Sequence, residues 1–250
     1  MNNISKAFEN KNAVITFITC GDPDFETTAE AVKVAEENGT DLIELGIPFS
    51  DPTAESALVQ ESNLRALESG ATTDKIFDFV KEIRKDTSLP LIFKTYANVV
   101  FSYGTERFMS ACKDIGIDGI LILDLPYEEK EEFHPICQKY GIALISMIAP
   151  TSHNRIEMIA KEAEGFIYIL PSPSAEINGE NTEEALKEAV KIIRNTTDTP
   201  CAVDFDTTAS HSDEKFADGV IISTKIATLL SKYGKDAPKH IGEYIKTLKN

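Results

Sequence analysis

Short apolar runs alternate along the chain with longer segments in which apolar residues recur at helical spacing among charged ones. Helical spacing is clearest over residues 25–39, 72–86 and 181–195. Gly39 follows Asn38 at the end of the first of these segments, where a glycine commonly ends a helix. The apolar runs that we expect to be strands cover residues 13–19, 41–45, 89–96, 119–125, 142–148, 165–170, 200–205 and 218–223.

This alternation predicts an α/β protein in which parallel strands are joined by helices. Eight strands close a (β/α)8 TIM barrel, so we favour that fold over an open doubly wound sheet. A chain of 250 residues is also typical of one barrel domain, and we expect a single domain over residues 1–250. The most loop-like stretch is PSPSAEINGENT at residues 171–182.

Composition excludes several classes of protein. A formal net charge of −16 lacks the lysine and arginine footprint that a nucleic-acid backbone requires. No apolar run is long enough to span a membrane, and the start MNNISKAFEN does not resemble a signal peptide. The cysteines and histidines are dispersed without ligand spacing, so we expect a cytoplasmic protein with reduced thiols and with neither metal nor cofactor.

The chemistry of a (β/α)8 barrel lies at the carboxyl ends of its strands. Glu44 lies inside the apolar strand DLIEL, where a carboxyl group is costly to bury without a role or a partner. Burial should raise the pKa of Glu44 and suit it to proton transfer near neutral pH. The next segment, IPFSDPTAES at residues 47–56, is a long polar loop that contains Asp51 and Glu55.

Charged side chains also mark the ends of later strands. Lys94 and Tyr96 share one face at the end of the third strand. Asp204 and Asp206 are two residues apart at the end of the seventh, so their carboxylates should face one spot. Two roles are open for Lys94. It is either an ion-pair partner of Glu44, Asp204 or Asp206, or a Schiff-base nucleophile with a pKa lowered by desolvation.

Motifs spread from end to end of the chain carry a resemblance to a known family. They are GDPDFETT (21–28), DLIELGIPFSDPTAES (41–56), TYANVVFSYG (95–104), LDLPYEE (123–129), IAPTS (148–152), EGFIYIL (164–170) and ADGVIIS (217–223). They resemble the tryptophan synthase alpha chain family, for which IELGIPFSDP is highly specific. The resemblance implies a barrel that cleaves indole-3-glycerol phosphate by a retro-aldol reaction to indole and glyceraldehyde 3-phosphate. It also implies a tryptophan synthase beta chain as partner.

The resemblance implies roles for individual residues as well. Glu44 matches the family's general acid/base, and Glu55 matches an aspartate that holds the indole nitrogen as it develops charge. Tyr96 and Tyr168 match aromatic residues of the family's substrate pocket. Positions of the family associated with partner contact and loop closure correspond to Pro48, Asp51, Asp124 and Pro126. After Glu55 the family's Gly-Pro pair is replaced by Ser56-Ala57, which should alter the path of the loop.

The phosphate end departs from the family pattern. A glycine-rich loop becomes PSPSAEING, Gly-Phe-Gly becomes Asp204-Phe205-Asp206, and Gly-Ser becomes Ser223-Thr224. Backbone N–H groups hold a phosphate at such sites, and proline has none to offer. Like charges at about 4 Å cost roughly 4 kcal/mol at an effective dielectric near 20. We therefore expect these loops to disfavour a phosphate dianion.

Three functions follow from these patterns. The first is the family's lyase reaction with Glu44 as acid/base, weakened or altered at the phosphate end. The second is a repurposed or redesigned pocket for a substrate that lacks phosphate or is cationic, with Glu44 as base or Lys94 as amine catalyst. The third is a non-catalytic relic that binds a partner.

Overall fold

We describe a computed structural model of the chain over residues 3–10, 12–170, 182–204 and 216–249. Within these residues nine parallel strand segments form one sheet in the order β5-β4-β3-β2-β1-β9-β8-β7-β6. The strands are β1 (Ala13–Thr19), β2 (Leu42–Gly46), β3 (Leu91–Thr95), β4 (Gly119–Ile122), β5 (Ala143–Leu144), β6 (Ser146–Ile148), β7 (Ile167–Ile169), β8 (Cys201–Asp204) and β9 (Gly219–Ile222).

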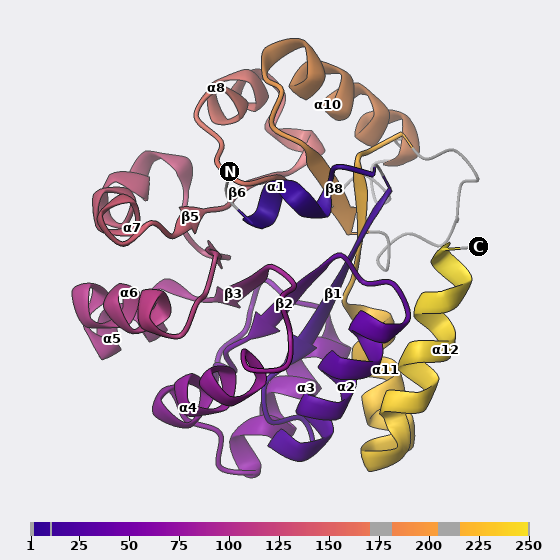
Figure 1. Cartoon of the computed structure of the whole chain (residues 1–250). Helices are drawn as coiled ribbons and strands as arrows, with labels where there is room; N and C mark the ends of the chain where they lie inside the picture. The colour runs from indigo at the N-terminus through magenta and orange to yellow at the C-terminus, as the bar shows by residue number, and fades with distance from the viewer. Residues whose placement is uncertain (1–2, 11, 171–181, 205–215, 250) are drawn as a thin grey trace.

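Helices surround this sheet (Figure 1). They are α1 (Asn3–Ala7), α2 (Phe25–Glu37), α3 (Ala57–Glu68), α4 (Thr73–Ile83), α5 (Ala97–Tyr103), α6 (Thr105–Asp114), α7 (His134–Tyr140), α8 (Ile156–Lys161), α10 (Thr182–Thr196), α11 (Thr224–Tyr233) and α12 (Ala237–Lys249). The three segments with the clearest helical spacing are confirmed as α2, α4 and α10. Gly39 has φ +102° directly after Asn38, the C-cap of α2, so the expected glycine stop is confirmed.

The sheet closes through residues 143–148, and the expected barrel is confirmed. β5 pairs with β4, whereas β6 pairs with β7. Between them lies Ile145, whose N–H donates to the Ile120 carbonyl oxygen 2.8 Å away. The expectation of one continuous strand over 142–148 is wrong at this residue, because the ladder passes there from one neighbour to the other. The interrupted strand still joins both edges of the sheet.

Apolar side chains pack on both faces of the sheet, as in other parallel sheets covered by helices. Outward-facing side chains pack against the helices, and inward-facing ones fill the barrel. Ile4 of α1 is fully buried in the inner cluster and lies beside Gly119 and Gly165, at the starts of β4 and the β7 segment. Helix α1 therefore covers the amino end of the barrel, which leaves the carboxyl end for the site.

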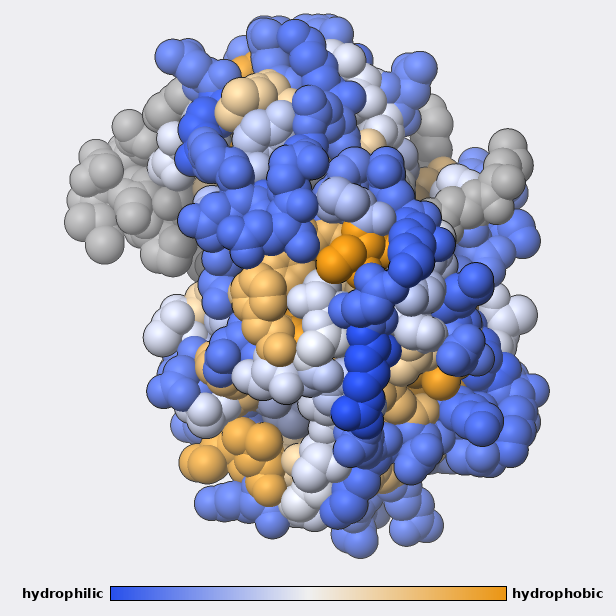
Figure 2. All heavy atoms as spheres, turned by 90° about the vertical axis from the view of Figure 1, so that its left-hand side faces the viewer, coloured by the Kyte–Doolittle hydropathy of each residue, from blue (hydrophilic) through white to orange (hydrophobic). Residues whose placement is uncertain are grey.

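The face of the molecule seen in Figure 2 is mainly hydrophilic, with apolar areas between charged side chains. Such a surface is consistent with the strongly acidic composition. In the described part of the chain, every helix is too short or too polar to cross a membrane.

Candidate active site

Inward-facing polar side chains from four strands meet at the carboxyl end of the barrel. They are Glu44 on β2, Lys94 on β3, Tyr168 on β7 and Asp204 on β8, and all four are buried. Along each of these strands, side chains point alternately into the barrel and outward to the helices, because the strand period is two residues. The sequence named all four residues as site candidates, and the barrel brings them to one place.

Glu44 is completely buried, and neither carboxyl oxygen has a hydrogen-bond partner among the described residues. Burial raises the pKa of Glu44 to about 8, and the nearby Asp204 and Glu55 carboxylates act in the same direction, whereas Lys94 opposes them. Near neutral pH the group is therefore poised between its acid and its carboxylate form. A carboxyl group in this state can both give and take a proton.

Lys94 forms an ion pair inside the mouth. Its Nζ lies 3.4 Å from Glu55 Oε1, and each side chain is only 6% exposed. Burial acts to lower the pKa of Lys94, but the carboxylates of Glu55, Glu44 and Asp204 outweigh it and the pKa is raised. The lysine is thus an ammonium, which favours the ion-pair role over the Schiff-base role. Its partner is Glu55, which is not among the partners expected from the sequence, because only the folded loop brings Glu55 over β3.

The loop between β2 and α3, residues 47–56, is held by Asn63. Asn63 Nδ2 lies 3.2 Å from Glu55 Oε2, and Asn63 Oδ1 accepts from the Phe49 N–H at 2.9 Å. The sequence reading missed Asn63. A signal was available: Val59, Ser62, Asn63 and Ala66 form the buried face of α3, and a polar pair on such a face indicates a specific partner.

Tyr96, the residue between β3 and α5, contacts the same loop. Its hydroxyl oxygen accepts from the Ala54 N–H at 3.1 Å, and its ring centroid lies 5.1 Å from that of Phe49. Burial, and then the charge of Glu55, raise the pKa of Tyr96, so the phenol is neutral. Tyr96 therefore helps to fix the loop that carries Glu55. The expected contact between Tyr96 and a substrate stays a prediction.

Asp204 is held by two hydroxyl groups. Its Oδ2 accepts from Tyr168 Oη at 2.7 Å and from Ser223 Oγ at 2.9 Å, which ties β7, β8 and the end of β9 together. Thr224, the first residue of α11, lies with its hydroxyl 3.2 Å from that of Ser56. Phe205, Asp206 and residues 171–181 lie outside the described residues, so the expected loss of the phosphate site is not tested there.

The residues expected at a partner contact lie at the same end of the barrel. Asp124 is exposed and accepts from the Ala97 N–H at 2.7 Å, so it caps the start of α5. Asp51 is exposed and accepts from Ser50 Oγ at 2.6 Å. Pro48, in the 47–56 loop, is buried, and Pro126 is exposed. Their part in partner binding stays a prediction.

A second ion pair, which was not expected from the sequence, joins α3 to the segment after β1 and is partly buried. Asp22, in the turn that follows β1, is completely buried and accepts from Arg65 Nε at 2.8 Å and Nη2 at 2.7 Å. The Ser62 hydroxyl also donates to Asp22. This bidentate pair fixes α3, and with it the anchor of the 47–56 loop, against the barrel.

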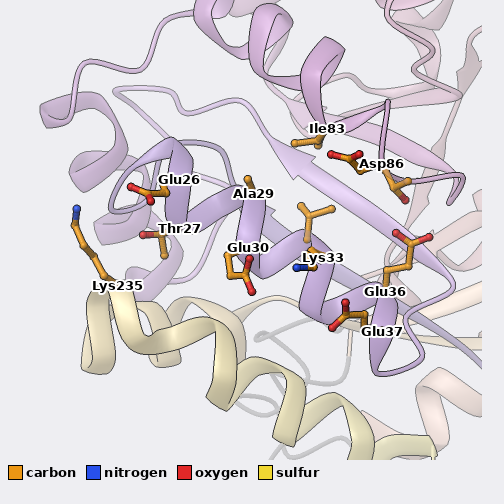
Figure 3. Close-up of a pocket in the computed structure, with 12 residues that line it drawn as sticks. Glu26, Thr27, Ala29, Glu30, Lys33, Glu36, Glu37, Ile83, Asp86 and Lys235 are labelled. Carbon is orange, nitrogen blue, oxygen red and sulfur yellow. The ribbon is translucent and has the colours of Figure 1, made fainter.

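A large open groove lies elsewhere in the described part of the chain, along α2 (Figure 3). It measures about 1030 Å³, and the acidic side chains of Glu26, Glu30, Glu36, Glu37 and Asp86 line it. Lys33 and Lys235 also line it, so its charge is mixed. Most of these charged groups are solvated on an open surface, unlike the buried groups at the barrel mouth. We therefore assign the candidate site to the mouth.

Relatives of the chain are found over its whole length. A family model described as "Tryptophan synthase alpha chain" matches residues 4–249. The alpha chain of Lacticaseibacillus casei is 42% identical, with 100% of this chain and 95% of that protein covered. The alpha chain of Thermoanaerobacter sp. (strain X514) is 38% identical, with 100% of this chain and 99% of that protein covered.

Solved structures share the fold. Tryptophan synthase subunit alpha from Campylobacter jejuni matches with a TM-score of 0.84 and 31% identity, covering 96% of each chain. A chain of the tryptophan synthase complex from Pyrococcus furiosus matches with a TM-score of 0.84 and 28% identity, covering 95% of this chain and 98% of that one.

Proposed function

The chain belongs to the tryptophan synthase alpha chain family, and from this premise we propose that it cleaves indole-3-glycerol phosphate to indole and glyceraldehyde 3-phosphate. The reaction breaks the bond between indole C3 and the glycerol chain. The hydroxyl group on the adjacent carbon loses its proton as the aldehyde forms, and C3 gains one. The step is redox-neutral and balances with proton transfers alone, so we expect no cofactor.

The buried carboxyl group of Glu44 is the observation that carries this proposal. It has no hydrogen-bond partner among the described residues, and its pKa of about 8 lets one group accept the hydroxyl proton and donate to C3. Glu55, held at the mouth by Lys94 and Asn63, is the proposed partner of the indole nitrogen. Its carboxylate would stabilise the positive charge that the nitrogen gains as C3 is protonated.

Indole release from indole-3-glycerol phosphate tests the proposal. We expect Glu44→Gln to lower the rate by roughly 10²–10⁴-fold, because an amide cannot exchange protons as the carboxyl group does. Glu106→Gln is the matched control, since Glu106 is half exposed and pairs with Lys139 on the surface. Equal activity of the wild type and Glu44→Gln would contradict the assignment. No activity in any form, with and without a beta chain, would favour the non-catalytic relic.

We also propose that the phosphate end binds its dianion weakly. Asp204 supports this, because its buried carboxyl group lies against Ser223, directly before the first turn of α11, where the family places phosphate. Asp204→Asn should therefore tighten the binding of glycerol phosphate, measured by calorimetry, while the hydrogen bonds to Tyr168 and Ser223 are largely kept. Unchanged or weaker binding would contradict this part. That result would also remove the support for the second candidate function, a pocket for a substrate without phosphate, because this candidate assumes that the Asp204 carboxylate repels the dianion.

The neighbour from Pyrococcus furiosus is a chain of a tryptophan synthase complex, and a second structure from that organism concerns the α2β2 assembly. We propose that this chain likewise binds a beta chain, through the end of the barrel that presents Asp51, Asp124 and Pro126 beside Pro48. A cytoplasmic location follows from the same assignment. Co-elution with a beta chain in size-exclusion chromatography, reduced by Asp124→Lys, would support the interface.

A further inference from the structure

Lys94 directs its ammonium group into the barrel rather than toward solvent. The residue is 5% exposed, and its Nζ lies 4.3 Å from the centroid of the Phe17 ring and 5.5 Å from that of Tyr168. Such contacts with aromatic faces stabilise a desolvated cation. The two rings come from β1 and β7, so packing from both sides determines where this charge lies.

The register of β1, β2 and β3 determines how Phe17 packs beside Lys94. Lys94 is opposite Gly46, and Glu44 is opposite Phe17. A Cβ atom at Gly46 would lie 2.7 Å from the Phe17 ring, so the ring rests directly against the glycine backbone. A larger residue at Gly46 would displace Phe17 and with it the surface on which the ammonium lies. The position of the lysine is therefore built into three adjacent strands.

Four titratable groups face this ammonium, each from a different segment. They are Glu44 on β2, Glu55 on the 47–56 loop, Tyr168 on β7 and Asp204 on β8. The phenol of Tyr168 is neutral, because burial and then Asp204 raise its pKa. Three carboxyl groups thus share one cation. Without it, Glu55 would lose its ion pair, and Glu44 would face only groups that favour its protonated form.

We propose that Lys94 is a positioning residue of the cleavage reaction, whose buried ammonium holds the Glu55 carboxylate at the mouth and provides the positive charge that keeps Glu44 able to ionise. The proposal rests on the proposed function for its kinetic consequence, but its electrostatic part does not depend on any substrate. It assigns a role to a residue that the sequence reading left between a structural ion pair and a nucleophile.

Removing Lys94 and removing Glu55 should shift the pKa of Glu44 in opposite directions. Lys94→Met removes the cation, so the pKa of Glu44 should rise by about one pH unit or more. Glu55→Gln removes a carboxylate, so the pKa of Glu44 should fall. The double variant Lys94→Met/Glu55→Gln should lie between the two. The double variant removes both charges of the Lys94–Glu55 pair, so it leaves neither of them buried without its partner. It can therefore be compared with Glu55→Gln even if Lys94→Met alone does not fold.

Two measurements read out these shifts. The first is the titration of the Glu44 carboxyl carbon by 13C NMR in the full chain, which needs no substrate. The second is the pH profile of kcat/KM for indole release, whose limb assigned to Glu44 should move to higher pH in Lys94→Met. A purely structural role of Lys94 would lower the rate at all pH values and leave the limb where it is. Lys139→Met is the matched control, since Lys139 is 60% exposed and pairs with Glu106.

The outcomes separate this proposal from the assigned activity. If the Glu44 titration is the same in Lys94→Met as in the wild type, or if it is the same in the double variant as in Glu55→Gln, the proposal is wrong. If the titration shifts as stated but the wild type releases no indole at any pH, the electrostatic role of Lys94 stands and the proposed reaction fails.

Discussion

Glu44 shows how one side chain can serve chemistry at the expense of stability. A carboxyl group with an ordinary pKa of 4.5 is held in the barrel at a pKa of about 8, chiefly because burial disfavours its charge. Between these two values the unfolded chain has released the proton, whereas the folded chain still holds it. The folded state binds more protons in this range, so its free energy of unfolding falls as the pH rises.

This linkage predicts a stability difference that depends on pH. Glu44→Gln carries no titrating group, so its free energy of unfolding relative to the wild type should increase between about pH 4.5 and pH 8. The slope should reach about 1.4 kcal/mol per pH unit. Urea unfolding of both proteins at pH 5 and pH 8 measures the effect. A difference that is equal at the two pH values would show that Glu44 titrates normally in the folded chain.

At the scale of elements, the site depends on how α3 and the 47–56 loop are joined. Asn63 links the loop backbone at Phe49 to the Glu55 carboxylate, and it also donates to the Val59 carbonyl at 2.8 Å. The Asp22–Arg65 pair fixes the same helix two residues further on. Three hydrogen bonds of one buried side chain thus determine where the proposed ligand of the indole nitrogen lies.

Asn63→Ala should therefore reduce both the stability of the chain and its activity. The loss of these hydrogen bonds should lower the free energy of unfolding by about 1–3 kcal/mol. The rate of indole release should fall roughly tenfold or more, because Glu55 loses one of its two anchors. Urea unfolding and the indole assay on the same samples measure both effects. Glu68→Ala, on the exposed side of α3, is the control, and an equal rate in both variants would contradict the anchoring role.

At the scale of the whole molecule, the two ends of the barrel have different tasks. The amino end is closed by α1, whose Ile4 side chain is fully buried among inward-facing residues of the strands. The carboxyl end carries the charged groups and the long loop. The amino end of the barrel thus contributes to stability and the carboxyl end carries the candidate site, as is usual for this architecture.

Ile4→Ala tests that division. It should lower the free energy of unfolding by roughly 2–5 kcal/mol, because it leaves a cavity among the inner side chains. The pH limb that belongs to Glu44 should not move, since the two residues lie at opposite ends of the barrel. Leu64→Ala, at a position 56% exposed, should change stability by only about 0.5 kcal/mol. A shifted limb in Ile4→Ala would mean that α1 is coupled to the site.

The periodic features of the structure were readable from the chain. The alternation of apolar runs with helical segments predicts the barrel, and Gly39 marks the end of α2, because these features depend on local spacing. The interruption at Ile145 was not readable, since it arises where one strand changes partners. The Asp22–Arg65 pair was missed for a related reason, because its members are 43 residues apart along the chain.

The sequence by itself determined the family, the barrel and the identity of Glu44 as an acid inside an apolar strand, because motifs and strand periodicity are properties of neighbouring residues. Only the tertiary structure decided that Lys94 pairs with Glu55, that Asp204 is held by Tyr168 and Ser223, and that Glu44 has its pKa raised to about 8. Burial and charge at the mouth are set by side chains from several strands at once, and no local pattern specifies that sum.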